Sequence, residues 1–276
     1  ELIEYKNTKG NSLKALLYYP AKYDSTKKYP MVVYIYEKLT KELNHVYLNP
    51  SQIYGDASIN ITNLTSRGYF VLAPDISYEI GDPGISATDC VVSATKEVII
   101  RGLVKSDKIG LTGHSFGGYE TNFIITQTNL FATAISGSGW TEMTSAYLTL
   151  GWNTGRPDLW RFESQQLRMG KSLFEDRESY QRNSPIEYVD KITTPLLLWS
   201  GKEDVQVNWN QSIQLYVALR RLDKKHIMLL YPKEGHSLSN HENLKDLSVR
   251  IHQWFDYYLK DTAPAAWITE GLKSSN

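Results

Sequence analysis

Two hydrophobic patterns alternate along the chain. In the first, a short run is rich in apolar or aromatic residues and is bounded by turn-forming residues, as in buried β-strands. Runs of this kind cover residues 13–19, 31–36, 69–73, 108–112, 131–136, 196–200 and 226–231. In the second, apolar side chains recur every three or four residues, which predicts amphipathic helices. This pattern covers residues 61–67, 85–104, 116–128, 209–222 and 244–259.

The order of these segments predicts an α/β fold. Strands separated by helices form a mostly parallel sheet that helices cover on both faces. The connection between the first two strands is short and flanked by Pro20 and Pro30, so these two strands are open to an antiparallel arrangement. At 276 residues the chain is long enough for one large domain or two small ones, and a single domain over residues 1–276 is the simpler interpretation.

The segment from about residue 140 to residue 183 interrupts this alternation. It is rich in Trp and Arg, with Trp140, Trp152, Trp160, Arg156, Arg161, Arg168, Arg177 and Arg182. Segments of this length between regular elements are often functional. Two interpretations remain open: a cap over an active site, or an ordinary surface insertion with solvated arginines.

Composition and charge exclude several classes of function. The 30 basic side chains balance the 30 acidic ones, so no overall field favours nucleic acid or an anionic membrane. The single Cys90 forms no internal disulfide, and the six histidines lack the spacing of metal ligands, so we expect neither a metal nor another cofactor. No run approaches the ~18 consecutive apolar residues of a membrane-spanning helix. Composition therefore does not indicate a binding partner, and the substrate class must be inferred from the residues of a local site.

Residues Gly113, Ser115 and Gly117 form a G-x-S-x-G motif directly between a predicted strand and a predicted helix. The nucleophile elbow of α/β-hydrolases requires this setting, because a sharp turn there exposes the serine hydroxyl. Alone, such a pentapeptide arises by chance in roughly one chain of this size in ten. A glycine-rich structural turn is the alternative. An elbow serine also places the next backbone N–H, that of Phe116, where it can stabilise an oxyanion.

A serine hydroxyl needs a base to accept its proton and a carboxylate to orient that base. In this fold the acid and the histidine follow the serine in that order. Asp204 comes just after the predicted strand 196–200, and His236 follows the strand 226–231. We therefore predict the triad Ser115, Asp204 and His236.

Other acidic and histidine residues compete for these roles. Glu203 is next to Asp204, and Asp75 also ends a strand but precedes the serine, so a turn or capping role suits Asp75 better. Four of the remaining histidines are assigned to surface or packing roles: His45, His226, His241 and His252. His114 is expected to point away from the reaction centre, and a role in binding the oxyanion or the substrate is the alternative.

An ordered set of motifs resembles the catalytic domain of the prolyl oligopeptidase family of serine peptidases, closest to its dipeptidyl peptidase IV and acylaminoacyl peptidase branches. The motifs are Lys28-Tyr29-Pro30, Gly113-His114-Ser115-Phe116-Gly117-Gly118-Tyr119, Asn183-Ser184-Pro185, Gly201-x-x-Asp204-x-x-Val207 and Gly235-His236. The resemblance covers residues 4–259. It implies an α/β-hydrolase fold.

The resemblance also assigns further residues. In the family, a tyrosine shortly after the Tyr-Pro dipeptide donates its hydroxyl to the oxyanion, and Tyr36 matches that position. The glycine-rich stretch that usually follows is replaced here by Glu37-Lys38-Leu39. Tyr147 lies near the aromatic residues that line a substrate pocket in the dipeptidyl branch. The family's N-terminal β-propeller has no counterpart in these residues, so an upstream propeller and a homo-oligomer are expected partners of the domain. The tail Pro264-x-x-Trp267 resembles the C-terminal end of bacterial members.

These residues together predict a serine peptidase that hydrolyses short peptides through an acyl-enzyme. A carboxylesterase with the same triad is the first alternative, since the triad does not distinguish an amine from an alcohol leaving group. A non-catalytic binding module is the second, and it would be marked by a missing triad residue.

Overall fold

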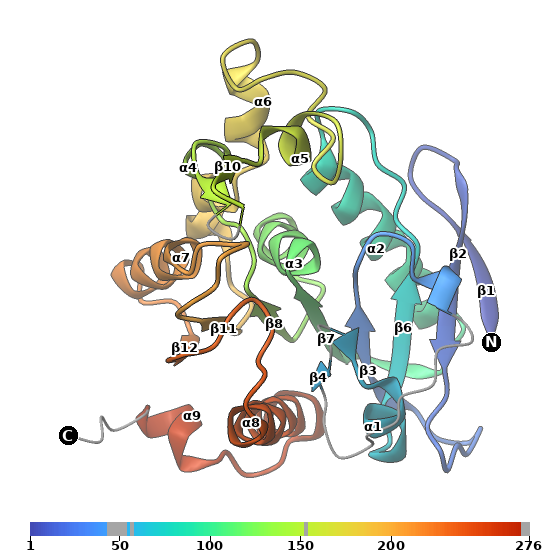
Figure 1. The fold of residues 1–276 in the computed structure, drawn as a ribbon. Coiled ribbons are helices and arrows are strands. Elements are labelled where there is room, and N and C mark those ends of the chain that lie inside the picture. Colours follow the sequence, from blue (N-terminus) through green and yellow to red (C-terminus); the bar gives the residue numbers. More distant parts are fainter. Residues whose placement is uncertain (43–53, 56–57, 152–153, 272–276) are drawn as a thin grey trace.

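The computed structural model describes residues 1–42, 54–55, 58–151 and 154–271, so His45 and Trp152 lie outside the described residues. One eight-stranded sheet forms the centre of the molecule (Figure 1). Its strand order is β1 (Leu2–Lys6), β2 (Ser12–Tyr18), β6 (Phe70–Pro74), β3 (Tyr29–Tyr34), β7 (Val104–His114), β8 (Thr133–Gly137), β11 (Leu196–Gly201) and β12 (His226–Tyr231). β2 pairs antiparallel with β1 and β6, and the other neighbours pair parallel. The predicted mostly parallel α/β sheet is confirmed.

Helices cover both faces of the sheet. One face is packed by α2 (Pro83–Ile100), α3 (Phe116–Gln127) and α7 (Asn210–Arg221), and the other by α1 (Ile61–Ser66) and α8 (His241–Lys260) (Figure 1). Side chains of a strand alternate between faces. Val33 and Leu72 therefore belong to the core under α2 and α3, whereas Val32 and Val71 belong to the core under α8. The short α9 (Ala266–Glu270) follows α8, and its Trp267 ring stacks on Trp254.

The structure corrects two of the predicted segments. The helix predicted to run to residue 104 ends at Ile100, because Gly102 adopts a φ of +73° and turns the chain into β7. β7 consequently begins at Val104, earlier than the predicted strand. β2 and β3 run in opposite directions, as considered above, but β6 lies between them. Neither β1 nor α9 was predicted.

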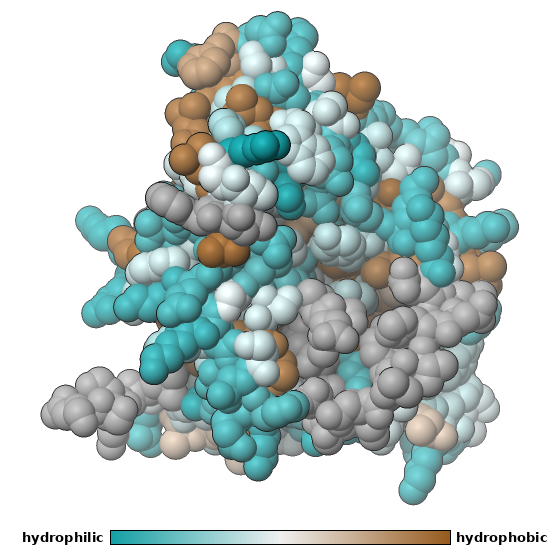
Figure 2. All heavy atoms as spheres, in the orientation of Figure 1, coloured by the Kyte–Doolittle hydropathy of each residue, from teal (hydrophilic) through white to brown (hydrophobic). Residues whose placement is uncertain are grey.

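The segment from 140 to 183 forms short elements above α3 in the view of Figure 1. They are α4 (Met143–Tyr147), β9 (Leu150–Gly151), β10 (Arg156–Pro157), α5 (Leu159–Glu163) and α6 (Arg177–Arg182), and we call residues 140–183 the insertion. Leu148, Trp160 and Phe174 are exposed on it. Figure 2 shows hydrophobic residues gathered at the top of the molecule, over the insertion.

The remaining short elements are η1 (Leu39–Glu42), β4 (Tyr54–Gly55), β5 (Ser58–Ile59) and η2 (Pro185–Lys191). Among the described helices, none combines the length and the apolar character that crossing a membrane requires.

Candidate active site

The turn between β7 and α3 places Ser115 at the carboxyl edge of the sheet. Ser115 has φ 59° and ψ −119°, a backbone conformation that costs a non-glycine residue about 1–3 kcal/mol. Its backbone N–H donates to the Gly137 carbonyl at 2.8 Å. A Cβ on Gly113 would lie 2.3 Å from the Gly117 carbonyl oxygen, and one on Gly117 would lie 2.2 Å from that of Ile35. The two glycines of the motif are thus required by close backbone contacts.

The structure brings Ser115, His236 and Asp204 together. His236 Nε2 lies 2.8 Å from Ser115 Oγ, and His236 Nδ1 lies 2.8 Å from Asp204 Oδ2. With a neutral imidazole, Nδ1–H donates to the carboxylate and Nε2 is left to accept the serine proton. The other carboxylate oxygen, Asp204 Oδ1, accepts the backbone N–H groups of Gln206 and Val207 at 2.8 and 2.9 Å. Asp204 is buried, so its orientation is fixed.

Backbone contacts hold the loops that carry Asp204 and His236 against each other. The N–H of Glu203 donates to the Glu234 carbonyl at 2.8 Å, and that of Lys202 donates to the Tyr231 carbonyl at 2.9 Å. A Cβ on Gly201 would lie 2.1 Å from the Gly235 carbonyl oxygen. Asp204 and His236 are therefore placed by the ends of the neighbouring strands β11 and β12.

The Glu234 side chain fixes the loop after β12. Its carboxylate accepts the backbone N–H groups of Ser239 and Asn240 at 2.7 and 3.1 Å and the Asn243 side-chain amide at 2.6 Å. Burial alone would raise the pKa of Glu234, but these hydrogen bonds hold it below its ordinary value. The negative charge is thus stable where it organises the loop of His236.

His114 supports His236 from within the sheet. Its ring stacks on Trp199 with centroids 5.0 Å apart, and its Nε2–H donates to the His236 carbonyl at 2.8 Å. Burial lowers the pKa of His114 to about 3, so the ring is neutral at physiological pH. The sequence predicted only that His114 points away from the reaction centre, and its contact with a residue 122 positions away left no local signal.

The competing residues have other surroundings. Glu203 is exposed. The Asp75 carboxylate accepts the backbone N–H and the hydroxyl of Thr40 at 2.9 and 2.5 Å, which suits the capping role considered for it. His252 is buried in α8, where burial lowers its pKa to about 3.

The two candidate oxyanion donors meet at the start of α3. Phe116 is the first residue of that helix, and its backbone N–H belongs to the helix end whose amides have no partner within the helix. Tyr36 follows β3, and its ring meets the Phe116 ring edge-on, with centroids 6.5 Å apart. The Tyr36 hydroxyl accepts the side-chain N–H of Gln166, from the insertion, at 2.9 Å. Burial is the main cause that raises the pKa of Tyr36, so the phenol keeps its proton at neutral pH.

Tyr147 lies inside the insertion, in a cluster of aromatic rings. It is buried, its ring packs edge-on against Phe162 and Tyr180, and its hydroxyl donates to Glu163 at 2.6 Å. The structure therefore does not bring its hydroxyl to the triad.

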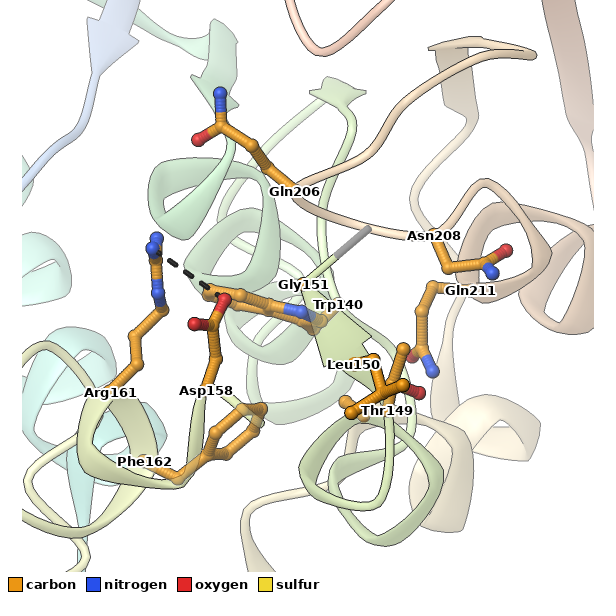
Figure 3. A pocket seen from close by; sticks show the side chains of 11 residues that line it. Trp140, Thr149, Leu150, Gly151, Asp158, Arg161, Phe162, Gln206, Asn208 and Gln211 are labelled. Atoms are coloured by element: carbon orange, nitrogen blue, oxygen red, sulfur yellow. Dashed lines mark ion pairs between the residues drawn. The ribbon is translucent and has the colours of Figure 1, made fainter. Parts of the chain in front are cut away.

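A small cavity beside this cluster is shown in Figure 3. It encloses about 20 Å³, roughly the room for one water molecule, between Trp140, Phe162 and polar side chains that include Gln206 and the ion pair of Arg161 with Asp158 at 3.8 Å. Gln206 lies two residues after Asp204 in the sequence, but no residue of the triad lines this cavity. A second, more open cavity of about 540 Å³ lies next to Tyr36 and is lined by Lys38, Lys41 and Arg168.

Among the described residues, no cluster of three or more His, Cys, Asp or Glu side chains could hold a metal ion.

Sequence comparisons find relatives of this chain among peptidases. The model of the prolyl oligopeptidase family matches residues 80–262. The chain is 27% identical to the uncharacterized peptidase YuxL of Bacillus subtilis, over 94% of this chain and 39% of that protein. It is 26% identical to a probable chloroplastic glutamyl endopeptidase of Oryza sativa, over 94% of this chain and 28% of the relative. The chain thus spans well under half the length of these relatives.

Solved structures share the fold. An acylaminoacyl peptidase of Pyrococcus horikoshii aligns with a TM-score of 0.77 at 21% identity, over 99% of this chain and 44% of that one. A puromycin hydrolase aligns with a TM-score of 0.76 at 18% identity, over 96% of this chain and 40% of that one.

Proposed function

Because the chain belongs to the prolyl oligopeptidase family, we propose that it is a serine peptidase domain that hydrolyses peptide bonds of short peptides. The observation that carries the proposal is the continuous hydrogen-bonded row of Ser115, His236 and Asp204, with both distances at 2.8 Å, on a strained strand-to-helix turn. The names of the relatives support the same reaction, since YuxL is described as a peptidase.

The proposed reaction has two halves. Ser115 Oγ attacks the scissile carbonyl carbon while His236 Nε2 takes the hydroxyl proton, and the carbonyl electron pair moves onto oxygen. The Tyr36 hydroxyl and the Phe116 N–H donate to that oxygen. As the tetrahedral species collapses, the C–N bond breaks and the proton on His236 passes to the leaving amine. Water then repeats the sequence on the acyl ester, which releases the acid and restores Ser115.

Asp204 acts through His236. Its carboxylate accepts from Nδ1–H, which selects the tautomer whose Nε2 accepts a proton and which stabilises the imidazolium that forms during the reaction. We assign Asp204 this orienting role, His236 the role of base and acid, and Ser115 that of nucleophile.

The surroundings of the site are part of the proposal. Residues 1–276 form one catalytic domain, in which the insertion serves as a cap, supported by its hydrogen bond to Tyr36. An upstream β-propeller and a homo-oligomer are the proposed partners, consistent with relatives that are more than twice as long as this chain. Tyr147 is proposed to contribute to substrate binding through the wall of aromatic rings rather than through its hydroxyl, which already donates to the Glu163 carboxylate.

A fluorophosphonate probe tests the proposal directly. We expect the purified chain to be labelled and Ser115→Ala to be unlabelled, because the probe reacts only with an activated serine. Ser106→Ala is the matched control, since Ser106 is exposed on the same strand, and it should label like the native chain. Absence of labelling, or equal labelling of Ser115→Ala, would show that the chain is not a serine hydrolase.

Parallel assays on aminoacyl anilides and short acyl esters separate the two hydrolase functions. A peptidase turns over the anilides. A chain that hydrolyses only the esters would be an esterase with the same triad.

A further inference from the structure

The insertion contacts two adjacent residues at the end of β3. Gln166 Nε2 donates to the Tyr36 hydroxyl at 2.9 Å, and Arg168 Nη2 donates to the Glu37 carboxylate at 2.6 Å. Arg168 also donates through Nη1 to the Gln166 carbonyl. We call the four residues joined by these hydrogen bonds the tyrosine clamp: Tyr36, Glu37, Gln166 and Arg168. It joins segments about 130 positions apart in the sequence.

The direction of the Gln166 hydrogen bond determines what Tyr36 can do. A phenol carries one proton and can accept on its oxygen as well. When the oxygen accepts from an amide N–H, the phenol proton remains available for another acceptor. Burial raises the pKa of Tyr36, so that proton is present at neutral pH. Gln166 is itself buried, and its donor is directed at Tyr36 rather than at water.

Glu37 explains why this chain needs a clamp. Its φ is +34°, in the region that favours glycine, yet the residue is a glutamate. Its carboxylate is bound by Arg168, and its backbone carbonyl accepts the Ile76 N–H at 2.7 Å. Contacts with the insertion and with the segment after β6 therefore hold a turn that glycine would adopt without them.

The guanidinium of Arg168 also connects the tyrosine clamp to α3, the helix that follows Ser115. Arg168 lies over the ring of Tyr78, 4.5 Å from its centroid, and the Tyr78 hydroxyl donates to Glu120. Glu120 is fully buried in α3, five residues after Ser115. The Tyr36 side of the site and the helix that carries Ser115 are thus joined through side chains.

We infer that Gln166 and Arg168 are positioning residues for Tyr36, which make the insertion part of the oxyanion-binding machinery. The inference rests on the proposed function, since it concerns the oxyanion of that reaction. Gln166 orients the hydroxyl and leaves its proton for the substrate oxygen. Arg168 fixes Glu37 and the Gln166 carbonyl, and through them the position of the Tyr36 ring.

Replacing Gln166 tests the inference. Gln166→Leu removes the donor, and we expect kcat on an aminoacyl anilide to fall roughly 10- to 100-fold with little change in KM, because a misplaced oxyanion donor affects the transition state. The rate of fluorophosphonate labelling should fall in parallel. In a Tyr36→Phe background, Gln166→Leu should cause no further loss, since both changes remove the same interaction.

Gln166→Glu tests the direction of the hydrogen bond without changing the size of the side chain. An ionised carboxylate only accepts, so the Tyr36 proton would be donated to residue 166 and lost to the oxyanion. We expect this variant to match Tyr36→Phe in kcat. It also serves as the second variant if Gln166→Leu does not fold, as judged by its thermal melting.

Gln181→Leu is the control, because Gln181 is an exposed glutamine of the same insertion whose side chain donates to Glu187 at 3.1 Å. It should leave kcat and labelling unchanged. The inference is overturned if a folded Gln166→Leu or Gln166→Glu variant behaves like Gln181→Leu, or if the losses with Tyr36→Phe multiply. A native chain that is not labelled at all would instead refute the proposed function.

Discussion

The two sides of Ser115 are held in different ways. On one side, Asp204 and His236 follow adjacent parallel strands, and backbone hydrogen bonds with a glycine contact at Gly201 lock their loops together. On the other side, Tyr36 follows β3, and its hydroxyl is bound by a side chain of the insertion. The first arrangement depends on the sheet, and the second depends on a segment outside it. We therefore expect the proposed acid and base to tolerate changes in the insertion, whereas the proposed oxyanion donor Tyr36 should be sensitive to them.

The largest effect is expected on the side of Ser115 that holds Asp204 and His236. Asp204→Asn should lower kcat by about 10⁴, because an amide cannot select the required tautomer or stabilise the imidazolium. The melting temperature should change little, since the asparagine oxygen can still accept the N–H groups of Gln206 and Val207. Anilide hydrolysis and thermal melting measure the two quantities. The exposed neighbour supplies the control, and Glu203→Gln should retain full activity. If Glu203→Gln were the damaging change, the acid would be misassigned.

A smaller loss is expected at the other side. Tyr36→Phe should lower kcat by about 10²–10³ with KM nearly unchanged, as is typical when one oxyanion donor is removed. Steady-state kinetics provide the measurement. Tyr23→Phe is a suitable control, because Tyr23 packs by its ring against Tyr19 and Phe70 away from the site. Full activity of Tyr36→Phe would leave the Phe116 N–H as the oxyanion donor and remove the functional reason for the tyrosine clamp.

The smallest effect is expected at Glu120 in α3, where the pH dependence of stability reports on the protonation of a buried carboxyl group. Burial raises the pKa of Glu120 to about 8, so the folded protein binds its proton more tightly than the unfolded chain does. The stabilisation from this proton is complete below about pH 4.5 and is lost as the pH rises to about 8. Glu120→Gln is neutral at every pH, so relative to the native chain it should gain stability, up to about 5 kcal/mol, by pH 9.

Thermal melting between pH 5 and pH 9 measures this difference. Glu4→Gln, at an exposed position of β1, should show the native dependence. A parallel pH dependence of Glu120→Gln and the native chain would mean that Glu120 is ionised in the folded protein. That result would mean that the Tyr78 hydroxyl and Arg168 keep Glu120 ionised in spite of its burial.

The parts of the molecule that follow from local rules were predictable. Strands and helices follow from hydrophobic periodicity, and the position of Ser115, Asp204 and His236 at strand ends follows from the order of elements together with the elbow motif. The end of α2 was misplaced because the apolar spacing continues past Ile100, and the left-handed turn at Gly102 overrides it. The place of β6 between β2 and β3 depends on pairing between distant segments, which no local pattern records.

The contacts around Tyr36 were not predictable for a related reason. Gln166 and Arg168 stand in a segment without clear periodicity, and their partners lie about 130 residues earlier. The presence of Glu37 even spoke against assigning Tyr36 as an oxyanion donor, because Glu37 replaces the small residues usual in the family. Its carboxylate and its positive φ acquire a reason only when Arg168 is seen beside it. Glu120 gave no signal either, since a polar residue in an elbow helix looks solvated until its burial is known.

The tyrosine clamp has a consequence for how such a domain diversifies. Insertions that cover active sites are the segments in which new substrate preferences arise, because they change without disturbing the sheet. On the inference above, that freedom is restricted here, because Gln166 and Arg168 of the insertion also position Tyr36. Grafting a related insertion onto this sheet should therefore change both substrate preference and kcat. A graft that preserves Gln166 and Arg168 should change substrate preference and leave kcat unaffected.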